Sequence, residues 1–167
     1  MAIVRPEVFS DHDAVRQIHR LAFGGPTEGS LVERLRGSSG SISLVATEAG
    51  SVVGHILFTA ATITGAGARA QVAGLGPMAV GPAWQHQGIG SELVRRGLEA
   101  CGRMGYEAVV VVGHPAYYPR FGFQRGSSFG LQCEFDVPDE VFMATELRSG
   151  ALAAGGDVRY APEFSEA

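Results

Sequence analysis

Residues 84–91 read Trp84-Gln85-His86-Gln87-Gly88-Ile89-Gly90-Ser91, and the pattern on either side of them decides the fold. Before them, the apolar run 74–80 is interrupted by glycine and proline, which is typical of a strand with an irregularity. After them, residues 91–103 repeat apolar side chains at helical spacing. The sequence therefore predicts a strand, a glycine-rich turn and a helix in direct succession.

The two glycines of this turn suit the binding of an anion. Without a Cβ atom, Gly88 and Gly90 let a ligand approach the backbone, and the N–H groups that open a helix attract negative charge. The spacing excludes two common nucleotide sites. Leu93 stands where a dinucleotide fingerprint needs its third glycine, and no lysine follows Gly90 as it would in a P-loop. We therefore expect a phosphate or pyrophosphate ligand of another class.

The gross composition is that of a globular domain that binds neither nucleic acid nor membrane. The 167 residues suit one domain over residues 1–167, and 46% of them are hydrophobic against 18% charged. A net charge of −4 provides no basic surface for nucleic acid, and no apolar stretch is long enough to span a bilayer. The N-terminus lacks a signal-peptide core, so the expected location is cytoplasmic.

The cysteines and histidines of this sequence do not form a metal-binding pattern. Cys101 and Cys133 are far apart and form no Cys-x-x-Cys pattern. His12 and His19 share roughly one face of an expected helix, but no third ligand accompanies them. We therefore expect no metal site.

Two helices are expected near the N-terminus, after a short strand over residues 2–5. The first begins at Ser10 and stops at the break that opens with Gly24, and the second covers residues 28–36. The first helix is expected to bury a single apolar stripe, formed by Ala14, Val15, Ile18, Leu21 and Ala22.

Strands dominate the rest of the chain. An antiparallel meander is expected over residues 42–49, 52–63 and 71–80, with a two-residue turn at Gly50-Ser51. Residues 108–112 are all apolar and mostly β-branched, which indicates a strand buried on both faces and parallel to the one that ends at Val80. The later elements expected are a helical turn and two strands, over residues 116–121, 141–147 and 157–160.

Two separated motifs resemble those of a known family. Residues 85–90 resemble the Gln/Arg-x-x-Gly-x-Gly/Ala signature of the GNAT superfamily, acetyl-CoA-dependent N-acetyltransferases in which this turn wraps the coenzyme A pyrophosphate. Tyr118-Pro119-Arg120-Phe121-Gly122-Phe123 resembles the family's Tyr-x-x-x-Gly-Phe element, and the closing stretches 137–139 and 158–160 resemble a small bacterial branch. The resemblance, which covers almost the whole chain, implies an α/β fold of the α+β mixed-sheet kind. Its central, mostly antiparallel sheet would contain one splayed parallel strand pair and be flanked by helices.

The resemblance also implies where acetyl-CoA would bind. The backbone of Met78, Ala79 and Val80 would pair with the pantetheine arm, along a strand that Gly74, Gly76 and Pro77 allow to bulge and splay. The pyrophosphate would lie against Gln85, His86, Gln87, Gly88, Ile89, Gly90 and Ser91. Positions 86 and 87 are often basic in the family, so binding here would depend on backbone N–H groups. Arg95 and Arg96 are either phosphate ligands or solvated helix side chains.

Acetyl transfer needs a neutral amine and a proton for the departing thiolate. Tyr118 aligns with the family's general acid, with the neighbouring Tyr117 as the alternative. The general base is open, because residues 72–76 lack the glutamate that many relatives carry. The candidates are His114, which is favoured because the parallel strands should part there, His55, Glu28, and a water held by backbone carbonyls.

The resemblance therefore implies direct transfer of acetyl from acetyl-CoA to a primary amine in a ternary complex. Two alternatives stay open: a catalytically weak acyl-CoA-binding sensor, suggested by the missing glutamate, and a transferase for a longer acyl group. The acceptor could be a small-molecule amine, a protein N-terminus or a lysine. In the family it docks near residues 23–30 and 130–136, where Glu28, Glu134 and Asp136 could attract a cation. Dimers are common in the family, so a homodimer is an open expectation.

Overall fold

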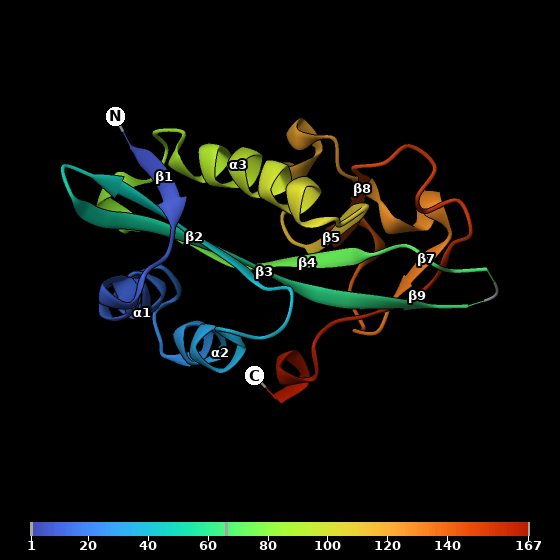
Figure 1. Cartoon of the computed structure of the whole chain (residues 1–167), viewed down its shortest axis with the longest axis horizontal. Helices are drawn as coiled ribbons and strands as arrows, with labels where there is room; N and C mark the ends of the chain where they lie inside the picture. Colours follow the sequence, from blue (N-terminus) through green and yellow to red (C-terminus); the bar gives the residue numbers. More distant parts are fainter. Residues whose placement is uncertain (1, 66, 167) are drawn as a thin grey trace.

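The computed structural model describes residues 2–65 and 67–166, and a mixed β-sheet forms its centre (Figure 1). Its strands lie in the order β1-β2-β3-β4-β5-β8-β6. Neighbours along this path are antiparallel except β4 and β5, which are parallel. The expected fold class, a mostly antiparallel sheet with a parallel pair, is confirmed.

The strands follow the expected order with small shifts in their ends. They are β1 (Ile3–Pro6), β2 (Ile42–Glu48), β3 (Ser51–Thr64), β4 (Val72–Val80), β5 (Ala108–Val112), β6 (Gln124–Arg125), β7 (Leu131–Cys133), β8 (Phe142–Glu146) and β9 (Gly156–Arg159). The sequence analysis did not predict β6 and β7, which are too short to show a period. β9 pairs with β3 and also, in parallel, with β7.

Helices cover both faces of the sheet. α3 (Ile89–Met104) lies on one face, and α1 (His12–Phe23) and α2 (Thr27–Leu35) lie on the other (Figure 1). Successive residues of β3 point to opposite faces of the sheet. Ile56 and Phe58 pack with α3, whereas Leu57 packs with α1 and α2. Short 3-10 turns connect these elements, at Phe9–Asp11, Pro82–Trp84, Tyr118–Phe121, Gly126–Phe129, Asp139–Val141 and Pro162–Glu166.

The buried stripe of α1 differs from the expected one. Leu21 is 55% exposed, whereas His19 is fully buried beside Val15 and Ile18. At about 100° per residue, His19 lies about 40° from Val15 around the helix, whereas Leu21 lies about 120° from Val15 in the other direction. A polar side chain therefore occupies a core position of this helix.

Two turns were placed one or two residues too late by the sequence analysis. The β2–β3 turn is formed by Ala49 and Gly50, both with positive φ, and Ser51 already pairs with Glu48. α3 starts at Ile89 instead of residue 91, so the end of the glycine-rich turn is the first turn of the helix.

The expected bulge and splay of β4 are both present. β4 pairs with β5 only over residues 72–75, although it continues along β3 to Val80. The register with β3 shifts between Ile56 and Phe58, opposite residues 75–78 of β4. The strands β4 and β5 therefore separate after Leu75, and the end of β4 continues toward α3.

The last residues return across the sheet to the α1–α2 side. After β9, the turn Pro162–Glu166 lies beside α2 (Figure 1). Its Phe164 packs against partners of both the β9 region and the α2 region. Within the described part of the chain, no helix has the length and apolar character that crossing a bilayer requires.

Candidate active site

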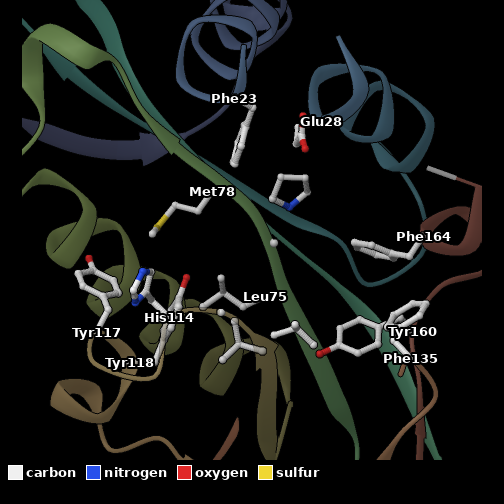
Figure 2. A pocket seen from close by; sticks show the side chains of 15 residues that line it. Phe23, Glu28, Leu75, Met78, His114, Tyr117, Tyr118, Phe135, Tyr160 and Phe164 are labelled. Carbon is white, nitrogen blue, oxygen red and sulfur yellow. The ribbon is translucent and has the colours of Figure 1, made fainter. Parts of the chain in front are cut away.

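Two adjoining cavities lie where β4 leaves β5. The first, which we term the turn cavity, has a volume of about 570 Å³ and is lined by Met78, Ala79, Val80, Trp84, Gln85, His86, Gly88, Ile89, Gly90, Ser91, Tyr117 and Arg120. The second, the aromatic cavity, has a volume of about 610 Å³ and is lined by Phe23, Glu28, Leu75, Gly76, Pro77, Met78, Val111, Val112, Gly113, His114, Tyr117, Tyr118, Phe135, Tyr160 and Phe164 (Figure 2). Met78 and Tyr117 belong to both.

The structure brings nearly all of the expected cofactor residues to the turn cavity. Gln87 does not line it, and its side chain instead donates to the Ala83 carbonyl at 3.4 Å. The amide of Gln85 donates to the Val80 carbonyl at 3.0 Å and so ties the turn to the end of β4. These two glutamines therefore shape the turn.

The start of α3 presents backbone donors to this cavity. Gly88 has a φ of 84°, a conformation that glycine adopts without strain. The helical bonds begin with the Glu92 N–H donating to the Gly88 carbonyl at 3.0 Å. The N–H groups of residues 89–91 are thus the ones that an α-helix leaves without internal partners, and they attract an anion.

Gly90 and Gly88 are needed for different reasons. A Cβ atom on Gly90 would lie 3.0 Å from the hydroxyl of Tyr117, which itself lies 3.4 Å from Ser91 Oγ. A Cβ atom on Gly88 would meet nothing within 4 Å, so its backbone conformation is what requires glycine there. Gly90 therefore allows a tyrosine hydroxyl to reach the helix start.

Arg120 is a cavity residue that the sequence analysis missed. It lines the turn cavity with its guanidinium 4.7 Å from the centre of the Tyr117 ring. The two arginines considered from the sequence have other contacts: Arg95 lies over the Phe121 ring, and Arg96 pairs with Glu92 at 2.9 Å. The only sequence signal for Arg120 was its place within the second motif.

Tyr118 is closely packed at the start of the 3-10 turn that follows β5. A side chain on Gly113 would overlap its ring, and the Phe123 ring packs against it at 5.6 Å between centroids. Tyr118 is 7% exposed, and its hydroxyl points into the aromatic cavity without a hydrogen bond to any described residue (Figure 2). Burial raises the pKa of Tyr118 to about 12. At neutral pH it is therefore a protonated donor.

The candidate bases fall into two groups. His114 and Glu28 both line the aromatic cavity, His114 as an exposed residue just after β5 and Glu28 from the first turn of α2. His55 lines neither cavity, because it is fully buried between His19 and Ser43. The structure therefore gathers Tyr118, His114 and Glu28 and separates them from His55.

Only one of the three expected acidic residues faces a cavity. Glu134 accepts a hydrogen bond from the Tyr160 backbone N–H at 2.7 Å, and neither Glu134 nor Asp136 lines the aromatic cavity. Glu28 alone does so. Among residues 2–65 and 67–166, no group of three or more His, Cys, Asp or Glu side chains could hold a metal ion.

Comparison with protein families and curated proteins identifies close relatives of this chain. Residues 4–126 match the model of the acetyltransferase (GNAT) domain. The uncharacterized N-acetyltransferase YjhQ of Escherichia coli is 35% identical over 159 residues, which cover 91% of this chain and 88% of YjhQ. The uncharacterized N-acetyltransferase YhbS of Escherichia coli is 32% identical over 166 residues, 98% of each chain.

Solved structures agree with these sequence matches. YhbS from Escherichia coli in complex with CoA has a TM-score of 0.91 and 32% identity, over 98% of this chain and 92% of that one. A GNAT family acetyltransferase from Brucella melitensis in complex with acetyl-CoA has a TM-score of 0.79 and 34% identity, over 98% of each chain. This chain therefore belongs to the GNAT superfamily of acetyltransferases.

Proposed function

We propose that this acetyltransferase transfers acetyl from acetyl-CoA to a primary amine, directly and within a ternary complex. The observation that carries the proposal is the meeting of the two cavities at Met78 and Tyr117, with the Tyr118 hydroxyl pointing into the second. A donor bound in one cavity and an acceptor in the other would meet where β4 and β5 part.

The turn cavity fits the phosphate and pantetheine parts of acetyl-CoA. The N–H groups of residues 89–91 and the guanidinium of Arg120 supply positive potential for the pyrophosphate. The pantetheine arm carries amides, and residues 76–80 of β4 have a free edge because, in the described part of the chain, no strand pairs with them on the β5 side. Residues 78–80 and 85–91, which the sequence analysis expected to bind the cofactor, are the segments that would make these two contacts.

The proposed chemistry uses Tyr118 as the acid. The thioester of acetyl-CoA supplies an activated acyl group, so that a C–N bond forms as the C–S bond breaks. Tyr118 Oη, which burial keeps protonated, donates its proton to the departing thiolate. The amine loses its protons to His114, or to a water relayed toward solvent, because His114 is exposed at the edge of the same cavity.

Calorimetric titration with acetyl-CoA, beside NADH and ATP, tests the proposal first. We expect micromolar binding of acetyl-CoA alone, followed by thiol release when amines are added. Absence of binding would mean that the turn at Gly88 only caps a helix. Comparison of acetyl-, succinyl- and malonyl-CoA would show which acyl group is transferred.

A sensor that binds acyl-CoA without turnover is the second candidate. It is favoured by one observation: residues 72–76 of β4 carry no titratable side chain. Acetyl-CoA binding with no thiol release over a broad amine panel would support the sensor over the transferase.

A further inference from the structure

The walls of the aromatic cavity indicate the class of acceptor, and this inference rests on the proposed function. Aromatic side chains converge on the cavity from segments that are distant in the sequence (Figure 2). Phe23 comes from the end of α1, Tyr117 and Tyr118 from the segment after β5, and Phe135, Tyr160 and Phe164 from the C-terminal part. Walls of aromatic side chains favour ligands with an apolar, aromatic body.

Three of these rings form one continuous wall. The Tyr160 ring centre lies 5.6 Å from that of Phe135 and 5.5 Å from that of Phe164. The ring of Tyr160 also packs directly against β4, because a Cβ atom on Gly74 would come within 2.8 Å of two atoms on one edge of the ring. Because Gly74 has no side chain, the Tyr160 ring can occupy this position against the strand.

The hydroxyl of Tyr160 has no hydrogen-bond partner among the described residues, although it is buried. Figure 2 shows it turned away from Phe164 and toward the strands, in the wall of the cavity. Buried hydroxyls are rarely left unpaired, because water has been removed from them. Because protein atoms cover this hydroxyl almost completely, a molecule in the cavity would contact the ring of Tyr160 and not its hydroxyl.

The charge of the cavity matches a single cation. Among the 15 residues that line it, Glu28 is the only carboxylate, and there is no lysine or arginine. The carboxylate of Glu28 makes no ion pair or hydrogen bond with the described residues. A polyamine would leave further ammonium groups without partners, and an amino acid would leave its carboxylate without one.

We propose that the acceptor is a small arylalkylamine, with one ammonium group and one flat aromatic body. Its ring packs against the wall formed by Phe135, Tyr160 and Phe164. Its ammonium group enters between Glu28 and Tyr118, where Glu28 attracts the cation and the proposed transfer takes place. The cavity volume of about 610 Å³ leaves ample room for a ligand of this size.

A matched pair of amines tests the proposal. 2-Phenylethylamine and ethylamine differ only in the ring, so kcat/KM for thiol release should be at least about tenfold higher for 2-phenylethylamine. Spermidine and a lysine-containing peptide complete the panel. Equal values for the matched pair, or a preference for spermidine or the peptide, would overturn the acceptor class and leave the transferase intact.

Two variants test whether the preference for 2-phenylethylamine depends on the aromatic wall of the cavity. Phe164→Ala should raise KM for 2-phenylethylamine about tenfold while KM for ethylamine and for acetyl-CoA stays unchanged. Phe9→Ala is the matched control, since Phe9 is 87% exposed and lines neither cavity. An equal effect of both variants would contradict the assignment of the wall.

A binding measurement separates this inference from the proposed function. If no amine is acetylated although acetyl-CoA binds, the proposed function fails. Titration of the protein–CoA complex with 2-phenylethylamine then still decides the acceptor class. Tighter binding than that of ethylamine, weakened by Glu28→Gln, would support the inference, and binding no tighter than that of ethylamine would overturn it.

Discussion

Tyr118 and Tyr117 are neighbours in the chain, but the fold gives them different surroundings. The hydroxyl of Tyr118 points into the aromatic cavity, whereas that of Tyr117 lies by Ser91 at the start of α3. We expect Tyr118→Phe to lower kcat by about ten- to a thousandfold, the usual contribution of a general acid, with little change in acetyl-CoA affinity. Steady-state kinetics and calorimetry measure both. A larger loss of kcat in Tyr117→Phe would transfer the role to Tyr117.

Arg120 offers a second test at the scale of one residue. Removing its charge with Arg120→Gln should weaken acetyl-CoA binding by about three- to tenfold, because a partly exposed charge contributes about 1 kcal/mol. The dependence of binding on salt should also decrease. Arg103→Gln, near the other end of α3, is the control. Equal affinities of the two variants would exclude Arg120 from the phosphate site.

Among the elements, α3 is the one whose position sets the turn cavity, and it rests on the sheet at a glycine. A Cβ atom on Gly97 would overlap the ring of Phe58, which is fully buried in β3. Gly97→Ala should therefore lower the free energy of unfolding by about 1–3 kcal/mol. Gly102→Ala, in the same helix with nothing within 4 Å, should raise it by about 0.5–1 kcal/mol.

Urea denaturation of both variants measures this pair. The contrast matters more than either value, because both changes add the same methyl group to the same helix. If Gly97→Ala were as stable as Gly102→Ala, the contact between α3 and β3 would have more room than the structure shows.

At the scale of the whole molecule, a buried polar chain joins the first two helices to the sheet. His19 Nε2 lies 2.8 Å from His55 Nδ1, and His55 Nε2 lies 2.7 Å from Ser43 Oγ. Ser43 donates to Glu7 at 2.8 Å, and Glu7 accepts from Arg36, which follows α2. Elements from β1 to β3 are therefore connected through one hydrogen-bonded network.

This network predicts a loss of stability in mild acid. Burial lowers the pKa of His19 from 6.5 to about 4, and burial also lowers the pKa of His55. Below pH 6.5 the unfolded chain takes up a proton that the native His19 does not, so stability falls between pH 6.5 and about 4, by up to about 3 kcal/mol.

Denaturation midpoints measured from pH 8 to pH 4.5 follow this loss. In His19→Gln the free energy of unfolding should fall less steeply as the pH is lowered, by a slope that corresponds to the uptake of up to one proton fewer on unfolding. Above pH 7 the pH profiles of the two proteins should be parallel. Identical profiles down to pH 4.5 would show that His19 does not carry the effect.

The amino-acid sequence by itself determined the order of most elements and the glycine-rich turn. These features depend on local preferences of the backbone and on the periods of apolar residues, which are visible within a few neighbouring positions. The splay of β4 was implied by the resemblance to a known family. The two motifs, each contained in a short stretch of chain, also indicated nearly all of residues 78–80 and 85–91 as the lining of one cavity. The second motif further indicated Tyr118, and the expected parting of the parallel strands favoured His114; both residues line the cavity beside it.

Only the tertiary structure decided which distant residues meet. Arg120 lines the turn cavity and Arg95 does not, Glu28 lines the aromatic cavity and Glu134 does not, and His19 is buried against His55. Phe164 returns from the C-terminal turn to complete an aromatic wall. Each of these depends on contacts between segments far apart in the chain, which no local period or motif contains.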